Sequence, residues 1–554
     1  MGPAATNGIA RRMRAVHAKH LRRTLVLGLL ALSMPILGGP ASAEATGKPA
    51  SGPTVTAALA SLKRSGAITA AVYQQDNSAY VAAQSSLKRL SGTRRTELGG
   101  VLANVQAIAA AREFIPSRLP ALFLTLERNR QWWTTGPQIA SRVRVSFPGS
   151  KLVWEYYQGQ GIEIQWLGTF GEGNGYYLSG NENANLHQLV SEIIPLATAR
   201  AGGIAWEYMF QFDGGKPPWT SGLSQGTALQ VLTRAWSRFK EPADLTAAQQ
   251  ALGIFKTAPP AGVRVTSAIG AHYLEYTYAP SDRILNGEIQ ALVGLYDYTS
   301  LTKDPVGLQL FEAGDAEARV RTPLYDTGSW SMYDQLGESN LNYHELLTEF
   351  LQHLCERTRK GEPIAPTAPP APVPAPTPTP PTSPTTPPTG GESPGGGTTG
   401  GTGGTGGASA ARYVAGASAS GAGSPATATA AASTTAPSPA IVADAIYCTT
   451  ATRFTADLST PPVISLITTT LPTSSRAGVQ LSLSKISTVR LAVRSAGKVV
   501  WTNGATVERG KPRLLWITPA KGGAYTVTLT ATDQTGNFAT ASGTITVSKG
   551  AKAH

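Results

Sequence analysis

A tract in the second half of the chain cannot form a compact core, and it divides the sequence into two parts. Residues 361–440 consist of repeated Pro-Thr, then Gly-Gly-Thr, then Ala-Ser-Thr sequences. Such a composition buries too little apolar surface to offset the entropy lost when a chain becomes ordered. The sequence therefore predicts a linker, stiff in its proline half and loose in its glycine half, between two folded regions.

The first 43 residues contain the parts of an export signal. Six basic residues precede an apolar run over residues 25–37, and residues 41–43 (Ala-Ser-Ala) offer a cleavage site. The sequence therefore predicts a secreted or cell-envelope protein. The Sec pathway is expected, and the adjacent Arg22 and Arg23 leave the twin-arginine pathway open.

The two cysteines, Cys355 and Cys448, lie on opposite sides of the predicted linker. In an oxidising compartment they can form a disulfide, and the closure of so long a loop would contribute roughly 4–5 kcal/mol to stability. The alternative is a pair of buried thiols. The sequence leaves both possibilities open.

Positive charge is concentrated after the linker. Residues 441–554 contain twelve Lys and Arg against four Asp and Glu, whereas residues 44–360 contain 28 of each. A polyanion or cell-wall glycan attracted over long distances would therefore contact the C-terminal region. The alternative is a solvated face that only keeps the protein soluble. No nucleic-acid partner is expected.

Apolar spacing indicates that the residues before the linker are mainly helical. Three stripes of helical period predict a bundle over residues 55–135, ahead of a larger domain over residues 141–360. Helix pairs joined by aromatic-rich loops favour an incomplete α/α toroid with a cleft at one rim. The helices of this toroid are predicted at residues 186–201, 221–239, 244–255, 284–300, 306–316 and 341–357.

Other segments follow the period of two that is typical of strands. Residues 141–177 alternate in this way, and residues 171–175 (Gly-Glu-Gly-Asn-Gly) are interpreted as a glycine-rich turn, because the full spacing of a nucleotide-binding loop is absent. A short sheet element is predicted at residues 262–278. Seven short runs within residues 441–549 predict an all-β, Ig-like sandwich. The expected fold class is thus mainly α with a small β region, followed by this sandwich.

The stretch over residues 321–355 gathers polar aromatic residues around one turn. Residues 326–329 (Asp-Thr-Gly-Ser) form turns readily, and they would place Tyr333 in a loop. Residues 342–345 (Asn-Tyr-His-Glu) have the spacing of a capping box, which puts Tyr343 on the first turn of the next helix. Tyr343 would then stand at the mouth of a helix.

Three motifs in one order resemble the D-glucuronyl C5-epimerases, which invert uronic acid residues within a polysaccharide. They are Trp219–Trp236 (WTSGLSQGTALQVLTRAW), Leu274–Tyr298 (LEYTYAPSDRILNGEIQALVGLYDY), and the PLYDTGS, YD and YH sequences between Pro323 and His344. Tyr156–Gly171 also looks related. The resemblance implies a toroidal fold, an anionic uronate polysaccharide as substrate, and no cofactor or metal.

Inversion at C5 needs proton-transfer groups on opposite faces of the sugar ring and groups that neutralise its carboxylate. The resemblance points to Tyr276 and Tyr343 as the proton-transfer pair, with Glu275 and Tyr333 as helpers. A tyrosine is a donor at neutral pH, and it is a base only if a nearby positive charge lowers its pKa. Substrate binding is assigned to Arg283, Arg321, Tyr157, Gln225 and Asn286.

Other functions stay open at this point. Leu336 stands where the family pattern has an Arg, so the chain could bind an envelope glycan without changing it. A uronate polysaccharide lyase would share the first proton abstraction. A zinc peptidase is excluded, because Thr348 occupies the place of the second His after His344-Glu345.

Overall fold

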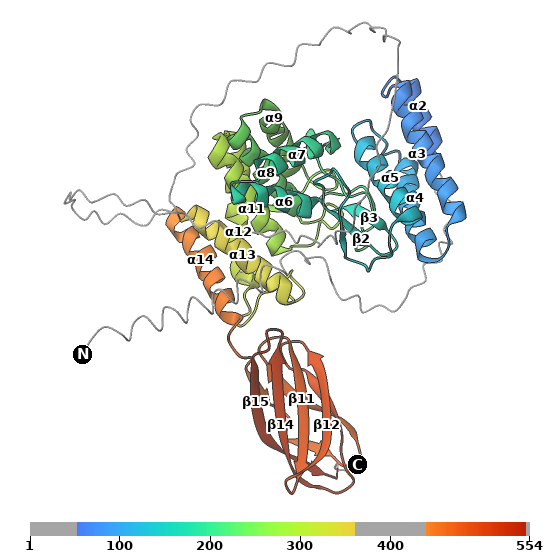
Figure 1. Ribbon diagram of the computed structural model, residues 1–554. Coiled ribbons are helices and arrows are strands. Elements are labelled where there is room, and N and C mark those ends of the chain that lie inside the picture. The colour runs from blue at the N-terminus through green and yellow to red at the C-terminus, as the bar shows by residue number, and fades with distance from the viewer. Residues whose placement is uncertain (1–51, 360–438, 550–554) are drawn as a thin grey trace, which may run out of the picture.

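The computed structural model describes residues 52–359 and 439–549, which form three parts in Figure 1. Helices near the N-terminus (blue) lie beside a larger group of helices (green to yellow), and a β region (red) extends from that group. The predicted export signal and nearly all of the predicted linker lie outside the described residues. None of the helices in the described residues is long and apolar enough to cross a membrane.

The first part contains only helices among its described elements. Thr54 and Thr69 begin the first two, since each threonine hydroxyl accepts a hydrogen bond from a backbone N–H three residues later. Along the third helix, the apolar stripe from Leu98 to Ile108 is buried against its neighbours. The four helices are α2 (Val55–Arg64), α3 (Ala70–Arg89), α4 (Gly92–Ala110) and α5 (Leu119–Thr135).

A small sheet follows, and the glycine-rich turn predicted at residues 171–175 is wrong. The strands β1 (Arg144–Val145), β2 (Trp154–Tyr157) and β3 (Gly161–Ile164) form the sheet, after which α6 (Trp166–Ser179) runs through all of these glycines. A Cβ at Gly173 would lie 2.4 Å from a methyl group of Val231 in α8 (Gly222–Phe239). The glycines therefore let two helices pack closely, rather than form a turn.

Two buried helices form the centre of the larger helical part. The backbones of α8 and α11 (Leu285–Thr302) touch, because a Cβ at Gly294 would lie 2.1 Å from the carbonyl oxygen of Gly226. In each of the two helices, 13 of the 18 residues are buried. The helices α6, α12 (Pro305–Arg321) and α13 (Leu341–Thr358) pack around this pair.

Shorter elements connect these helices and shape one end of the group. Two of them are two-stranded antiparallel sheets, formed by β4 with β5 and by β6 with β7. The bounds are α7 (Asn183–Ile193), η1 (Ile194–Leu196), β4 (Thr198–Arg200), β5 (Gly203–Ala205), α9 (Pro242–Ala251), α10 (Gly253–Lys256), β6 (Arg264–Thr266), β7 (Ala271–Tyr273) and η2 (Thr322–Tyr325).

The segment that follows the predicted linker begins with a helix rather than with the predicted sandwich. Helix α14 (Pro439–Asp457) packs along α13, as Figure 1 shows, and the disulfide Cys355–Cys448 joins the two helices. Tyr447, Ala451 and Phe454 form its buried stripe at helical spacing. This helix therefore completes the helical part, and the disulfide that the sequence left open is present.

The β region consists of two sheets around one apolar core. One sheet has the strand order β13-β10-β8, and the other has the order β12-β11-β14-β15-β9. Alternate residues of β10, β11 and β14 point into the shared core, as strand geometry requires. The strands are β8 (Ile464–Leu466), β9 (Thr470–Pro472), β10 (Arg476–Leu483), β11 (Ser487–Ser495), β12 (Lys498–Val507), β13 (Arg513–Ile517), β14 (Gly523–Asp533) and β15 (Phe538–Ser548).

Candidate active site

The structure brings four of the sequence-predicted residues into one buried cluster. The rings of Tyr333 and Tyr343 lie 4.5 Å apart between centroids. Hydrogen-bonding contacts join Tyr333 to both Tyr343 and Tyr276, and join Tyr276 to the carboxylate of Glu275. All four residues are at most 8% exposed. We call these residues, Glu275, Tyr276, Tyr333 and Tyr343, the tyrosine cluster.

Glu275 and Tyr276 reach the same cluster because they follow a strand instead of lying within it. β7 ends at Tyr273, and the chain then bends at Glu275. Residues that alternate along a regular strand would point to opposite faces. Gly287, in the first turn of α11, makes room for the carboxylate, since a Cβ there would lie 2.9 Å from Oε2 of Glu275. This close approach explains the glycine of the Asn-Gly sequence at the start of α11.

The loop between η2 and α13 carries Tyr333. Two isolated bridges shape it, Asp326 with Ser331 and Met332 with Glu338, and the backbone carbonyl of Tyr333 accepts from the N–H of Leu285 at 3.4 Å. Helix α13 is capped by Asn340, whose side chain accepts from the N–H of Tyr343 at 3.0 Å. The capping box predicted at residues 342–345 is therefore two residues too late, although Tyr343 does lie in the first turn.

Aromatic side chains line one side of the tyrosine cluster. The ring of Tyr276 stacks on Tyr278 at 5.2 Å and meets the edge of Trp219 at 5.7 Å. Phe212 joins Tyr276 to Tyr157, with centroids 6.0 and 6.3 Å away. The predicted residue Tyr157 therefore belongs to the same aromatic wall. Such a wall suits the apolar faces of sugar rings.

Arg142 is a cation that contacts these aromatic residues, and no local pattern in the sequence points to it. Its guanidinium lies 4.7 Å from the ring centre of Tyr157, and its charge acts to lower the pKa of Tyr343. Nη1 of Arg142 is buried and forms an ion pair with Glu155 at 3.6 Å, but it donates no hydrogen bond within the described residues. Arg142 also has a φ of 71°, an unusual backbone conformation that is often found at functional sites.

The two arginines that the sequence proposed for substrate binding are used elsewhere. The guanidinium of Arg283 donates to the carbonyl oxygens of Pro280 and Asp282 at 2.8 and 3.1 Å. Arg321 forms an ion pair with Glu317 at 2.6 Å, one helical turn away. Neither geometry places the cation against the tyrosine cluster.

The two predicted amides differ from each other. Gln225 is fully buried, and its amide exchanges hydrogen bonds with the backbone of Trp206, so it braces the core instead of facing a substrate. Asn286 is also buried, but neither atom of its amide has a hydrogen-bond partner within the described residues. Oε2 of Glu275 and the hydroxyl of Tyr278 are unsatisfied in the same way. Buried polar atoms are rarely left unpaired, so these groups are available to a ligand.

Burial separates the proton affinities in the tyrosine cluster. It raises the pKa of Tyr276 well above its ordinary value, and it raises those of Tyr333 and Tyr343 as well. Burial also raises the pKa of Glu275 to about 7. At neutral pH the phenols are therefore proton donors, and Glu275 is the member that exchanges its proton most readily.

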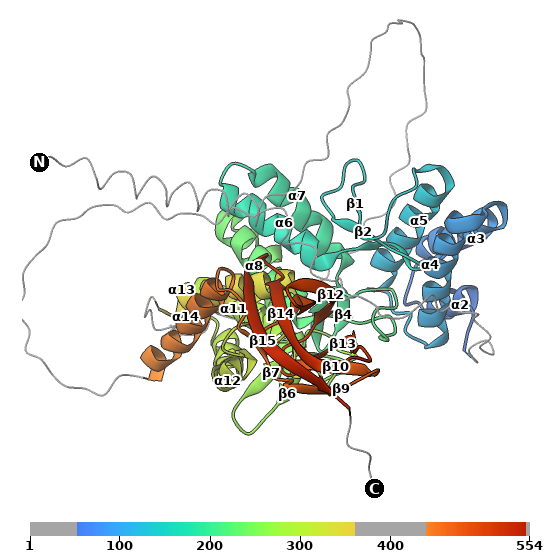
Figure 2. The same ribbon diagram turned by 90° about the horizontal axis from the view of Figure 1, so that it is seen from below.

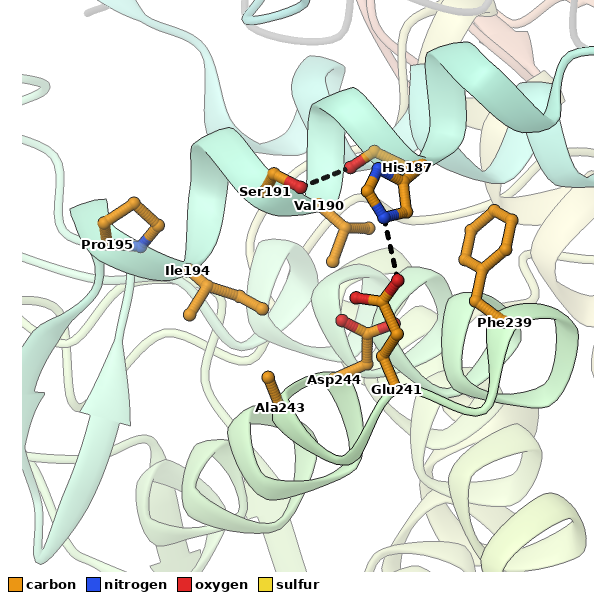
Figure 3. Close-up of a pocket in the computed structure, with 9 residues that line it drawn as sticks. All are labelled: His187, Val190, Ser191, Ile194, Pro195, Phe239, Glu241, Ala243 and Asp244. Atoms are coloured by element: carbon orange, nitrogen blue, oxygen red, sulfur yellow. Dashed lines mark hydrogen bonds and ion pairs between the residues drawn. The ribbon is translucent and has the colours of Figure 1, made fainter.

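A separate cavity of about 200 Å³ lies between α7 and the start of α9, and Figure 3 shows its lining. There His187 and Glu241 form an exposed ion pair at 2.8 Å, beside Asp244, whose pKa is raised by burial to about 6. The cavity shares no residue with the tyrosine cluster. Within the described part of the chain, no group of three or more His, Cys, Asp or Glu side chains could hold a metal ion.

Residues 201–365 match the family described as "D-glucuronyl C5-epimerase C-terminus". The D-glucuronyl C5-epimerase of Caenorhabditis elegans is 35% identical over 131 residues, which is 21% of this chain and 21% of that protein. An uncharacterized protein of Methanocaldococcus jannaschii is 28% identical over 168 residues, 29% of this chain and 54% of that protein. The predicted resemblance is confirmed for this region, which contains the tyrosine cluster but neither Arg142 nor Tyr157.

Proposed function

Because residues 201–365 belong to the D-glucuronyl C5-epimerase C-terminal family, we propose that this protein epimerises uronic acid residues of a polysaccharide at C5. The supporting observation is the tyrosine cluster, in which a carboxylate of raised pKa contacts a series of protonated phenols. The chain spans only about a fifth of the curated epimerase that it matches. The proposed activity therefore rests on the geometry of the tyrosine cluster as well as on the family match of residues 201–365.

The first step is removal of the C5 proton by Glu275. The electron pair of the broken C–H bond moves into the substrate carboxylate, which becomes an enediolate. Arg142 and the amide of Asn286 are the groups that would stabilise this charge, since each has a buried N–H group that donates no hydrogen bond within the part of the chain that the structure describes. A carboxylate with a pKa near 7 is suited to this step, whereas a phenol of raised pKa is not.

The second step is donation of a proton by Tyr343 to the opposite face of C5. The contacts within the tyrosine cluster then restore the starting state: Tyr333 protonates Tyr343, Tyr276 protonates Tyr333, and protonated Glu275 returns its proton to Tyr276. Each turnover moves one proton off C5 and one proton onto it. No oxidant or cofactor is needed for this balance.

Heavy water tests the proposed function. Between turnovers the O–H protons of the tyrosine cluster exchange with solvent, so the proton that is returned to C5 comes from the solvent. The full-length protein, incubated in heavy water with a glucuronate-containing polymer, is therefore expected to introduce deuterium at C5 without forming an ultraviolet-absorbing unsaturated uronate. An unsaturated product would instead indicate a lyase. A polymer that binds but stays undeuterated would indicate a glycan-binding protein, a function favoured by Leu336, which is 82% exposed where the family pattern has an Arg.

Replacing Arg142 with Met tests the site of carboxylate binding. We expect KM for the polymer to rise about tenfold, because a charge-assisted hydrogen bond contributes about 1.5–3 kcal/mol. Arg321→Met is the matched control, since the ion pair of Arg321 with Glu317 does not place this cation against the tyrosine cluster. Steady-state kinetics on both variants measure the difference. An unchanged KM in Arg142→Met, or an equal rise in the control, would show that Arg142 does not hold the substrate.

We also propose a setting for this activity. Export through an N-terminal signal is supported by the disulfide Cys355–Cys448, since such bonds persist in oxidising compartments.

An incomplete α/α toroid is supported by the helices that pack around α8 and α11, and an Ig-like sandwich is supported by the two sheets around one core. The positive charge of residues 441–554 supports contact between the β region and an anionic glycan or cell wall.

A further inference from the structure

The loop that carries Tyr333 is held from outside by the last part of the chain. Asp326, at its start, forms an ion pair with Arg453 of α14 at 2.5 Å. Glu338, near its end, forms an ion pair with Arg509 at 2.7 Å and accepts from the backbone N–H of Ile486 at 3.2 Å. Arg509 and Ile486 lie in connections of the β region, so the contacts come from a part of the chain that is distant in sequence.

Another contact reaches the start of helix α13. The first N–H groups of a helix have no partner within the helix. The side chain of Gln534, between β14 and β15, accepts from the N–H of Leu341 at 2.7 Å, just before Tyr343. In this way the β region supplies one cap and Asn340 supplies the other. Figure 1 shows the β region below the lower ends of α13 and α14, and Figure 2, seen from below, shows its strands in front of the larger group of helices.

A buried lysine lies at the centre of this contact. Lys485, between β10 and β11, is 1% exposed, and its ammonium donates to the carbonyl oxygens of Asp457 and Thr460 and pairs with Asp533 at 2.8 Å. It also lies 5.1 Å from the ring centre of Trp330, which belongs to the Tyr333 loop. A fully buried cation is costly unless it is well paired, so this position is strictly defined.

Trp330 connects Lys485 to His344, the residue that follows Tyr343. The indole stacks on the imidazole of His344 at 3.7 Å, and His344 accepts at Nδ1 from the N–H of Ser331 and donates from Nε2 to the carbonyl oxygen of Phe454. Burial lowers the pKa of His344 to about 4, so this imidazole stays neutral. His344 is thus a rigid link between the loop and helix α13.

We propose that Lys485, together with Arg509 and Gln534, is a positioning residue for Tyr333 and Tyr343. The β region is then a structural part of the active site and not only an attached binding module. This inference rests on the proposed function. A displacement of about 1 Å in a proton-transfer group can lower a rate by about a hundredfold, which is why contacts outside the tyrosine cluster matter to it.

The first test is Lys485→Met in the full chain. We expect kcat for deuterium incorporation at C5 to fall 10- to 100-fold, with KM for the polymer changed less than twofold. Amide hydrogen exchange, followed by mass spectrometry, should accelerate in peptides that cover residues 328–344. Lys498→Met is the matched control, since Lys498 is an exposed residue of the same β region, and both readouts should stay at the wild-type level.

A second variant is needed in case Lys485→Met does not fold, because that change leaves the buried Asp533 without its cation. Arg509→Gln with Gln534→Ala removes two contacts and leaves the buried lysine intact. It should show the same pattern to a smaller degree. Wild-type exchange in residues 328–344, or faster exchange with an unchanged kcat, would overturn the proposal. If the wild-type protein does not deuterate C5, the proposed function fails, and the positioning role fails with it. Hydrogen exchange distinguishes this outcome, because it still reports whether the β region holds the Tyr333 loop in place.

Discussion

Replacing Tyr343 with Phe is expected to lower the rate of deuterium incorporation at C5 by about 10²- to 10⁴-fold, the range that one acid–base group contributes. Tyr343 is 5% exposed, and burial raises the pKa of its phenol, so the hydroxyl stays protonated at neutral pH. Phe keeps the ring contact with Tyr333 and removes the hydroxyl that donates the proton. Binding of the polymer should therefore be preserved.

The control for this variant is Tyr525→Phe, which removes a phenol of the β region that donates to the carbonyl oxygen of Lys521. It should leave turnover unchanged. The measurements are the rate of deuterium incorporation and the Kd for the polymer. A Tyr343→Phe protein with full turnover would remove Tyr343 from the mechanism, and one that neither binds nor turns over would show that its hydroxyl serves binding.

Replacing Glu275 with Gln is expected to lower activity and to raise stability. Burial raises the pKa of Glu275 from 4.5 to about 7, so the folded protein binds this proton more tightly than the unfolded chain does. The folded protein therefore loses stability as pH rises from about 4.5 through 7, and a glutamine does not titrate. At pH 8 the Gln variant should be about 3 kcal/mol more stable than the wild type, and at pH 4 no more stable.

The same change should remove the pH dependence of catalysis. In the wild type the rate should rise about tenfold per pH unit below 7 and level off above it, because only the ionised carboxylate accepts a proton. Glu275→Gln should lose about 10²- to 10⁴-fold at pH 8. Urea unfolding and pH–rate profiles measure the two effects, with the exposed Glu312→Gln as control. A less stable Glu275→Gln protein at pH 8, or one with an unchanged profile, would contradict the assignment.

The helices and the tyrosine cluster could be predicted because both have local signals. Apolar stripes located α8, α11 and α13 to within one or two residues. The motifs around Glu275 and Tyr343 named residues that do lie together, although their roles remain predictions. The turn predicted around Gly173 is wrong because glycine is typical of turns in sequence patterns. Only the close packing against Val231 explains why a glycine lies in a helix here.

Arg142 could not have been found from local sequence. It alternates with apolar residues, as any surface residue of a strand would. Its proposed role is indicated by its proximity to Tyr157 and Tyr343, which approach it only in the folded chain. The start of the β region was misplaced for another reason. The sequence predicts a sandwich directly after the linker, whereas Tyr447 and Phe454 are buried in a helix that packs on α13, an element distant in sequence.

The disulfide between α13 and α14 also determines how the protein would respond to proteases. Cys355 and Cys448 lie on either side of residues 360–438, so a single cut within that interval divides the polypeptide without separating the two pieces. The nicked molecule would migrate as one species on a denaturing gel until a reductant is added. Cleavage there would therefore go unnoticed under non-reducing conditions, and both pieces would still contribute to one active site.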